Sequence, residues 1–138
     1  MALTARTLYP GEAAGALLVL DEPLSFWGGV DPVHGHVTNP RHPQHGASVA
    51  GRVLAIPRLV GSSSSSAVLL ELIRVGRAPA ALVLGAVDAI LVVGCLAGRE
   101  LGYACPPVVT LAPAAFAALP PAASVVRVDA REKAATIG

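Results

Sequence analysis

The sequence predicts an α/β domain with a mixed sheet, because short apolar runs typical of strands alternate with segments that have helical spacing. Of the 138 residues, 54% are hydrophobic but only 4% are aromatic, and the abundance of Ala, Val and Leu suits closely packed strands and helices. A chain of this length has the size of one compact domain. We therefore expect residues 1–138 to form a single domain with one core.

Strands are expected at the start of the chain. Residues 3–9 and 15–20 have strand-like composition, and the breaker Pro10-Gly11 between them predicts two strands joined by a turn. Residues 22–46 then lose the apolar periodicity and contain all four histidines of the chain. A loop of this length usually carries function or is disordered, and its Phe26-Trp27 pair argues against disorder.

The middle of the chain predicts a strand, a Gly–Ser turn and a helix in direct succession. Residues 50–56 form the strand, Gly61 opens the turn, and apolar positions in 68–75 recur at helical spacing. Gly76 is placed to end the helix, and the serines stand where N-caps are expected. Further along we expect a strand at 81–84, an element of undecided type at 88–97, a strand at 107–111, a short helix near 114–119 and a last strand at 124–128.

The charge and the cysteines limit the functions of the chain. The formal net charge is +1 and the basic residues are scattered, so we expect no nucleic-acid binding. Cys95 and Cys105 lack CxxC spacing, cannot complete a four-ligand cage for zinc or an iron–sulfur cluster, and are expected to be buried free thiols. Free thiols and the absence of a secretory signal point to the cytoplasm.

Residues 80–98 are almost wholly apolar and nearly long enough to cross a membrane. Asp88 would then sit near the bilayer centre at a cost of roughly 3 kcal/mol, and Gly85 and Gly94 interrupt the apolar run. We therefore expect no membrane span. The segment is predicted to form a buried strand, a turn around residues 86–88 and a second buried element.

The turn at residues 61–66 is the strongest candidate for chemistry. A run of five serines is usually a flexible linker, but a linker does not connect an apolar strand directly to an amphipathic helix. A purely structural role, in which the serines only cap the helix, is one hypothesis. The functional alternative is an anion site, in which free backbone N–H groups and the positive end of the helix dipole hold a carboxylate or a phosphate.

Several segments together resemble one known family. They are EPLSFWGGVDPVHG at 22–35, HPQHG at 42–46, GRVLAIP at 51–57, GSSSSS at 61–66 and RVGRAPAALVLGAVDAILVVG at 74–94. In this order they resemble the swivel domain of aconitase X enzymes, and the likeness covers roughly residues 8–112. Members of this family are dehydratases. The resemblance therefore implies a hydro-lyase and a swivelling β/β/α domain of the aconitase type.

The resemblance also implies a two-chain enzyme. In two-chain members a large subunit holds an iron–sulfur cluster or iron, and a small subunit of this size closes over it without binding a cofactor itself. The catalytic serine of the family follows the glycine of the turn, which corresponds to Ser62. Ser62 is expected to take a proton from the carbon beside the substrate carboxylate while the metal of the partner draws off the hydroxyl as water.

The serine turn suggests a substrate through the same resemblance. Archaeal members that act on phosphomevalonate tend to have a Gly-Ser-Thr-Val-Gly-Ser turn, whereas bacterial members that act on cis-3-hydroxy-L-proline often have a serine-rich one. Ser63, Ser64 and Ser65 depart from the archaeal pattern. This favours cis-3-hydroxy-L-proline over phosphomevalonate or another hydroxy acid.

Further residues are candidates for binding the substrate beside Ser62. They are Gly61, Ser63, Ser64, Ser65 and Ser66 of the turn, Trp27, Gly28 and Gly29 of the long loop, and Arg52 before the turn. Paired glycines let the backbone approach a ligand, and either Arg52 or Arg58 can clamp a carboxylate. The structural alternatives are a tight turn with a buried aromatic plug and ordinary surface arginines. Asp31 is expected to fix the loop.

The histidines and the serine turn are also compatible with functions other than catalysis. The four histidines lack the spacing of metal ligands and are expected to be solvated or hydrogen-bonded. Instead of an enzyme subunit, the chain can be a free-standing module that binds an anionic metabolite without converting it. It can also be a structural lid whose serines only cap a helix. Only the enzyme hypothesis requires a large-subunit partner.

Overall fold

The computed structural model describes residues 2–138, so Met1, which the expected domain 1–138 includes, lies outside the described residues. Within this part seven strands close into a barrel in the order β1-β5-β4-β3-β2-β6-β7. The strands are β1 (Leu3–Tyr9), β2 (Gly11–Val19), β3 (Val53–Ile56), β4 (Ala81–Leu84), β5 (Val108–Thr110), β6 (Val125–Ala130) and β7 (Ala134–Ile137). The helices are α1 (Ser65–Arg74), α2 (Ile90–Glu100) and α3 (Pro113–Ala117).

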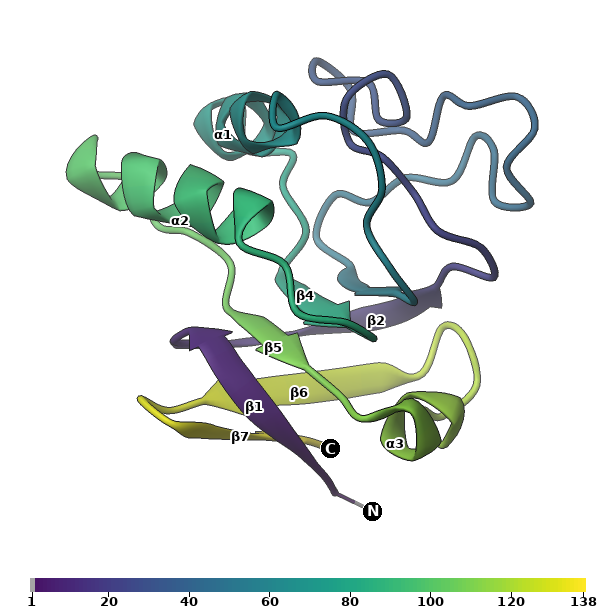
Figure 1. Cartoon of the computed structure of the whole chain (residues 1–138), viewed down its shortest axis with the longest axis vertical. Coiled ribbons are helices and arrows are strands. Elements are labelled where there is room, and N and C mark those ends of the chain that lie inside the picture. The colour runs from purple at the N-terminus through teal and green to yellow at the C-terminus, as the bar shows by residue number, and fades with distance from the viewer. Residues whose placement is uncertain (1) are drawn as a thin grey trace.

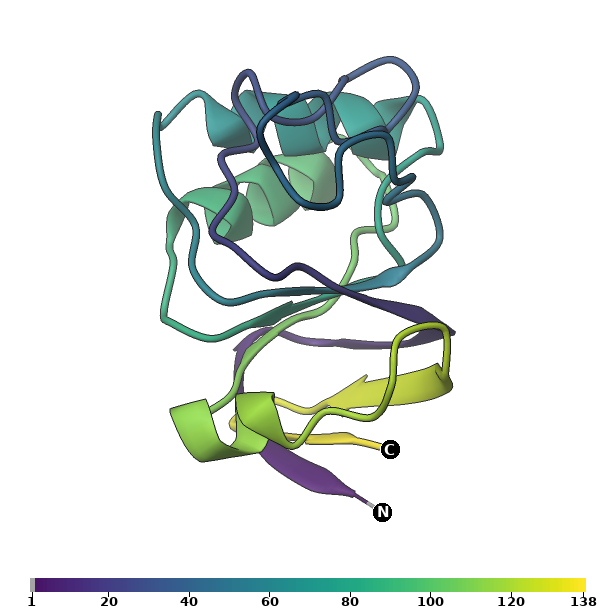
Figure 2. The same ribbon diagram turned by 90° about the vertical axis from the view of Figure 1, so that its right-hand side faces the viewer.

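Parallel and antiparallel strands occupy different parts of the barrel. The strands β2, β3, β4 and β5 are parallel neighbours, and all other pairs are antiparallel. The helices α1 and α2 and the long loop at 22–46 lie over the parallel part, whereas β6, β7 and α3 lie on the far side (Figures 1 and 2). The predicted α/β class with a mixed sheet is confirmed.

Two apolar clusters fill the molecule, one inside the barrel and one between the sheet and the helices. Residues of the central strands alternate between them: Leu82 and Leu84 face α1 and α2, whereas Ala81 and Val83 face the barrel interior. Every residue of β3 and β4 is therefore buried. These continuous apolar runs are typical of strands covered on both faces.

Three segments of the chain refine the predicted element order. The undecided segment at 88–97 is helical and belongs to α2. The chain does not end with the strand expected at 124–128, because β7 follows β6 and pairs with β1. The predicted turn at Pro10-Gly11 connects strands that do not pair with each other, because β1 pairs with β5 and β7 while β2 pairs with β3 and β6.

The long apolar segment at 80–98 divides between two elements. Residues 81–84 form the buried strand β4 as predicted, and the remainder enters α2, which has 11 residues. In residues 2–138 no helix has both the length and the apolar character needed to cross a membrane.

Candidate functional site

The serine turn follows β3 and lies at the carboxyl ends of the parallel strands, the edge at which α/β sheets bind ligands. A pocket of about 90 Å³ opens there between the loop from β3 to α1 and the loop from β4 to α2. Its lining residues are Leu59, Val60, Gly61, Ser62, Ser65, Asp88, Ile90 and Leu91. The pocket is therefore built from two successive crossovers.

The pocket separates the five serines into two groups, because only Ser62 and Ser65 line it. The Ser62 Oγ accepts a hydrogen bond from the backbone N–H of Ser64 at 3.0 Å. Ser65 is only 4% exposed, and its Oγ accepts the backbone N–H of Trp27 at 3.1 Å. Both hydroxyls act as acceptors in these bonds, so each keeps its own O–H for a ligand.

The serines outside the pocket shape the turn. The Ser66 Oγ donates to the backbone oxygen of Ser63 at 3.0 Å. Ser64 occupies the N-cap position of α1, but its side chain makes no capping hydrogen bond, so the capping hypothesis finds no support at this residue. The backbone N–H groups of Ser62 and Ser63 have no acceptor in the described part of the chain. These donors and the α1 dipole together can hold an anion.

Close backbone contacts fix both walls of the pocket. Gly61 has a φ of +97°, and a Cβ at this position would collide with the Ser25 side chain. The backbone N–H of Gly85 donates a hydrogen bond to the backbone oxygen of Ile56 at 2.9 Å, and a Cβ on Gly85 would collide with the backbone oxygen of Pro57. Both positions therefore need glycine, and the two loops are held against each other.

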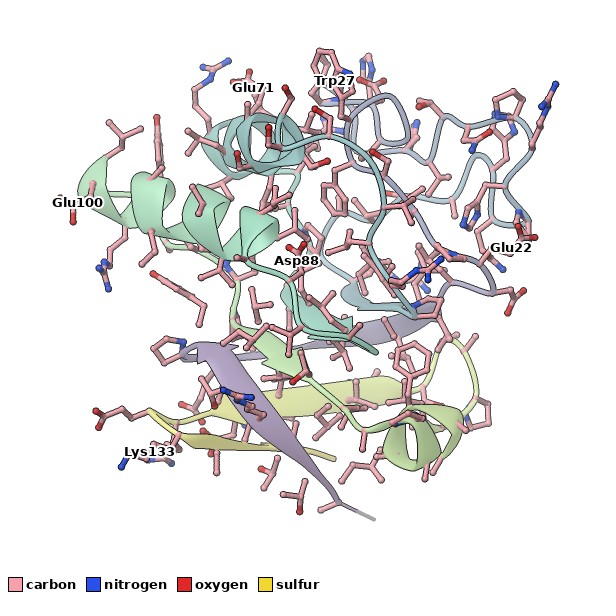
Figure 3. All side chains as sticks on the ribbon, in the orientation of Figure 1. Glu22, Trp27, Glu71, Asp88, Glu100 and Lys133 are labelled. Atoms are coloured by element: carbon pink, nitrogen blue, oxygen red, sulfur yellow. The ribbon has the colours of Figure 1, made fainter. Side chains whose placement is uncertain are left out.

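The N-terminal parts of α1 and α2 meet beside the pocket. A Cβ on Gly94 of α2 would lie only 2.9 Å from the backbone oxygen of Ser66 in α1. Asp88 lies at the start of α2, below α1 in the view of Figure 3. The Asp88 Oδ2 accepts the backbone N–H of Leu91 at 2.9 Å, so this carboxylate serves the N-terminus of α2.

Asp88 is the pocket residue that the sequence reasoning missed. From the sequence, Asp88 argued against a membrane span and was placed in a turn, but it was not named as a site residue. An acidic residue directly before an apolar segment is a known signal of a helix start, and this signal was present in the chain. Its position beside Ser62 could not be predicted, because it depends on the loop from β4 to α2 meeting the loop from β3 to α1.

The loop residues proposed as ligand contacts lie beside the pocket and do not line it. Trp27 and Gly28 border a neighbouring groove of about 470 Å³. Trp27 is 59% exposed, whereas Phe26 is fully buried, so Phe26 is the aromatic plug and Trp27 is not. Gly29 fits closely against the backbone oxygen of Ser25, where a Cβ would collide. Gly29 therefore allows a tight turn within the loop itself, which is the structural alternative.

Asp31 fixes this loop, as predicted. Its Oδ1 accepts the backbone N–H groups of Val33 and His34 at 2.8 and 3.2 Å, and its Oδ2 lies 2.8 Å from His34 Nδ1. The hydrogen bond from Val33, followed by that from the His34 side chain, lowers the pKa of Asp31 below its ordinary value.

Of the four histidines, His34 and His42 form side-chain hydrogen bonds in the loop, and His36 and His45 are exposed. His42 is 6% exposed, with Nε2 placed 3.2 Å from the backbone oxygen of Glu22 and Nδ1 accepting the backbone N–H of Gln44. This pairing requires the tautomer that carries its proton on Nε2. Among residues 2–138 no three His, Cys, Asp or Glu side chains gather into a possible metal site.

Arg52 is not near the serine turn. Its Nε and NH2 groups donate to the backbone oxygens of Ala16 and Leu17, both at 3.0 Å, at the amino end of β3. The strand β3 separates it from the turn, which follows the carboxyl end. The structure therefore does not bring Arg52 to the pocket, and its guanidinium instead ties β3 to β2. Arg58, beyond β3, is exposed.

Both cysteines are free thiols, as expected, although only Cys95 is fully buried. Burial, and next the neighbouring Cys105, raise the pKa of Cys95 to about 12. The Cys105 thiol donates to the backbone oxygen of Cys95 at 3.2 Å. A thiol with so high a pKa is a poor nucleophile, so Cys95 belongs to the core.

The fold and the pocket define an α/β barrel domain with a small pocket at the Gly–Ser turn, between two strand-to-helix crossovers. The family model of the aconitase X swivel domain matches residues 2–137. The chain belongs to the aconitase X swivel domain family. The resemblance found in the sequence is thereby confirmed.

Relatives of the chain occur both as separate subunits and within longer chains. A cis-3-hydroxy-L-proline dehydratase from Pseudomonas aeruginosa is 51% identical over 96 residues, which are 70% of this chain but 17% of the relative. A phosphomevalonate dehydratase small subunit from Thermococcus onnurineus is 43% identical over 96 residues, 70% of this chain and 74% of the relative. This chain therefore spans most of the small subunit but only 17% of the Pseudomonas relative.

A solved structure supports the same assignment. The crystal structure of Thermococcus kodakaraensis aconitase X in its holo-form superposes with a TM-score of 0.85 at 32% identity. The superposition covers 100% of this chain and 98% of that chain. The barrel and its crossovers are thus shared along the whole length of the two chains.

Proposed function

We propose that this chain is the small subunit of a two-chain aconitase X-type dehydratase and that Ser62 is its catalytic residue. The observation that carries the proposal is the pocket in which the Ser62 hydroxyl adjoins unpaired backbone N–H groups at the start of α1. A substrate of such a dehydratase carries a carboxylate. The free N–H groups of Ser62 and Ser63 suit that carboxylate without any basic side chain.

In the proposed reaction the Ser62 oxygen takes a proton from the carbon next to the substrate carboxylate. A serine hydroxyl is a weak base, and its alkoxide form needs a positive field. The start of α1 supplies such a field, and the hydrogen bond that the Ser64 N–H already donates to Ser62 Oγ strengthens as charge develops on that oxygen. Ser65, which also lines the pocket, can donate its O–H to the bound substrate.

The rest of the chemistry belongs to the partner. We assign an iron–sulfur cluster or iron to the large subunit and no cofactor to this chain. When bound there, the metal supplies the Lewis acid that draws off the hydroxyl of the substrate as water. We further propose that residues 1–138 act as one swivel-like domain and that the enzyme works in the cytoplasm, in keeping with two free cysteines.

We favour cis-3-hydroxy-L-proline as the substrate, with phosphomevalonate as the alternative. The Pseudomonas relative named for the first substrate is 51% identical and the Thermococcus relative named for the second is 43% identical, over alignments of equal length. The serine-rich turn supports the same preference. A module that binds an anionic metabolite without converting it is the alternative of another class.

The test is turnover of both substrates by this chain co-expressed with its large subunit. Ser62→Ala is expected to lower turnover by at least about 100-fold while the two chains still assemble. Ser64→Ala is the matched control, because Ser64 belongs to the same turn but does not line the pocket. Undiminished turnover in Ser62→Ala would exclude Ser62 from the mechanism. A wild-type chain that binds the substrate but never turns it over with any partner would support the binding module.

A further inference from the structure

A second pocket, of about 420 Å³, lies beside the serine pocket on the other side of the loop that follows β4. It is lined by Thr4, Ala5, Arg6, Gly85, Ala86, Val87, Thr110, Leu111, Ala112 and Lys133. The loop residues 85–87 border this pocket, and the next residue, Asp88, lines the serine pocket. Both pockets therefore lie at the carboxyl edge of the parallel strands, and one loop separates them.

The second pocket has two basic side chains without a charge partner. Arg6 and Lys133 are exposed and form no salt bridge within residues 2–138. Other arginines, such as Arg41 and Arg58, are also unpaired, but Arg6 and Lys133 line one pocket together. Arg6 lies opposite the residue that follows Lys133 in the pairing of β1 with β7. Figure 3 shows Lys133 at the turn between β6 and β7. Two unpaired like charges at one pocket attract an anion.

A threonine in the same pocket can also supply a hydroxyl to a ligand. Thr110 is 8% exposed, and the buried side-chain oxygen that lacks a hydrogen bond among the described residues is that of Thr7, not that of Thr110. It lies directly opposite Arg6 in the pairing of β1 with β5 and lines the pocket. A ligand in this pocket can replace water as the hydrogen-bond partner of the Thr110 hydroxyl.

We propose that Arg6, Lys133 and Thr110 form a binding site for a phosphate or phosphate-monoester group. Such a group carries a charge of about −1.5 to −2 near pH 7, which two cations can balance. Its terminal oxygens can each meet a donor, one from the arginine, one from the lysine and one from the threonine hydroxyl. A carboxylate carries a single charge, and it would leave one of the two cations unbalanced.

This site stands on the residues of this chain and does not depend on the dehydratase function. It is tested by titrating the full 138-residue chain with inorganic phosphate at constant ionic strength, observed through the backbone amide signals in NMR spectra. Saturable shifts are expected at Ala86, Val87 and Thr110. Acetate, titrated in the same way, is expected to bind at least about tenfold more weakly.

Variants decide whether the named residues hold the phosphate. Arg6→Gln and Lys133→Gln are each expected to weaken phosphate binding at least about tenfold. Arg41→Gln, which removes an exposed charge outside the pocket, is the control and is expected to change nothing. Should Arg6→Gln fail to fold, Lys133→Gln and Thr110→Val carry the test. Shifts that do not saturate, that acetate reproduces at equal concentration, or that survive these substitutions would overturn the proposal.

Discussion

Helices α1 and α2 follow neighbouring parallel strands and pack side by side, yet their N-termini differ. At α2 the Asp88 carboxylate accepts a backbone N–H. At α1 the Ser64 side chain makes no capping bond, and the N–H groups of Ser62 and Ser63 have no acceptor within residues 2–138. A helix needs a satisfied start for stability. The first N–H groups of α1 itself, from Ser65 to Val68, all find acceptors. The donors that stay free beside the serine pocket are those of Ser62 and Ser63, which precede the helix.

The open start of α1 is nevertheless held in place. Gly61 fits against Ser25, and the Ser65 Oγ holds the backbone of Trp27. A binding site gains from donors that are fixed before the ligand arrives, because no ordering cost then opposes binding. The free N–H groups of Ser62 and Ser63 therefore belong to a turn that these contacts hold in place.

The largest expected effect comes from closing the space at Gly61. Gly61→Ala places a side chain at a φ of +97° and against Ser25, and is expected to cost about 3 kcal/mol of unfolding free energy. Gly51 is a matched control, because it also has positive φ (+69°) but open space around its Cβ position. Gly51→Ala is expected to cost about 1 kcal/mol. Urea denaturation measures both.

A second substitution shows whether Ser25 causes the difference. Gly61→Ala combined with Ser25→Gly removes the side chain that a Cβ on Gly61 would meet. The double variant is expected to recover part of the lost stability, since the collision disappears but the strained backbone stays. Equal losses in Gly61→Ala and Gly51→Ala would show that the serine turn is not fixed by Ser25.

A smaller effect separates the two helix starts directly. Asp88→Ala removes the bond to Leu91 and is expected to cost about 1 kcal/mol, as for the loss of a side-chain acceptor at a helix start, although the N-cap residue itself is Ala89. Ser64→Ala removes no capping bond and is expected to cost less than about 0.5 kcal/mol. Thermal or urea unfolding of the two variants checks the order. A loss in Ser64→Ala as large as that in Asp88→Ala would contradict the contrast between the helices.

Much of the parallel part of the fold could be predicted from the sequence because its signals are local. The strand β3, the serine turn and α1 follow one another with clear apolar periodicity. The type of α2 stayed undecided because it packs closely against α1 and is apolar on most sides. The strand β7 has only Ala135 and Ile137 facing the barrel, and it pairs with β1 from the other end of the chain. Such long-range pairing leaves little local signal.

The candidate site follows the same division between local and long-range information. The position of Ser62 before a helix could be predicted, since a Gly–Ser turn between strand and helix is a local pattern. The sequence could not separate Ser62 and Ser65 from the other serines, because pocket lining depends on Asp88 and its loop. Arg52 failed as a candidate because carbonyl groups of β2, distant in sequence, satisfy its guanidinium.

The smallest expected effect concerns the loop that Ser65 holds against the open start of α1. Hydrogen bonds from Val33 and His34 keep the pKa of Asp31 below its ordinary value. Asp31 therefore stabilises the fold at pH values above the pKa of the unfolded chain, about 4, and loses this contribution as the pH falls through the lower folded pKa. Asp31→Asn is expected to flatten the fall in stability below about pH 5. The measurement follows unfolding through the fluorescence of Trp27, the single tryptophan.

The control is Glu132→Gln, which removes an exposed carboxyl outside the loop. Identical acid profiles of the wild type and Asp31→Asn would mean that the loop keeps its place without the charge of Asp31, and the rigidity beside α1 would then rest on Gly61 and Ser65 alone.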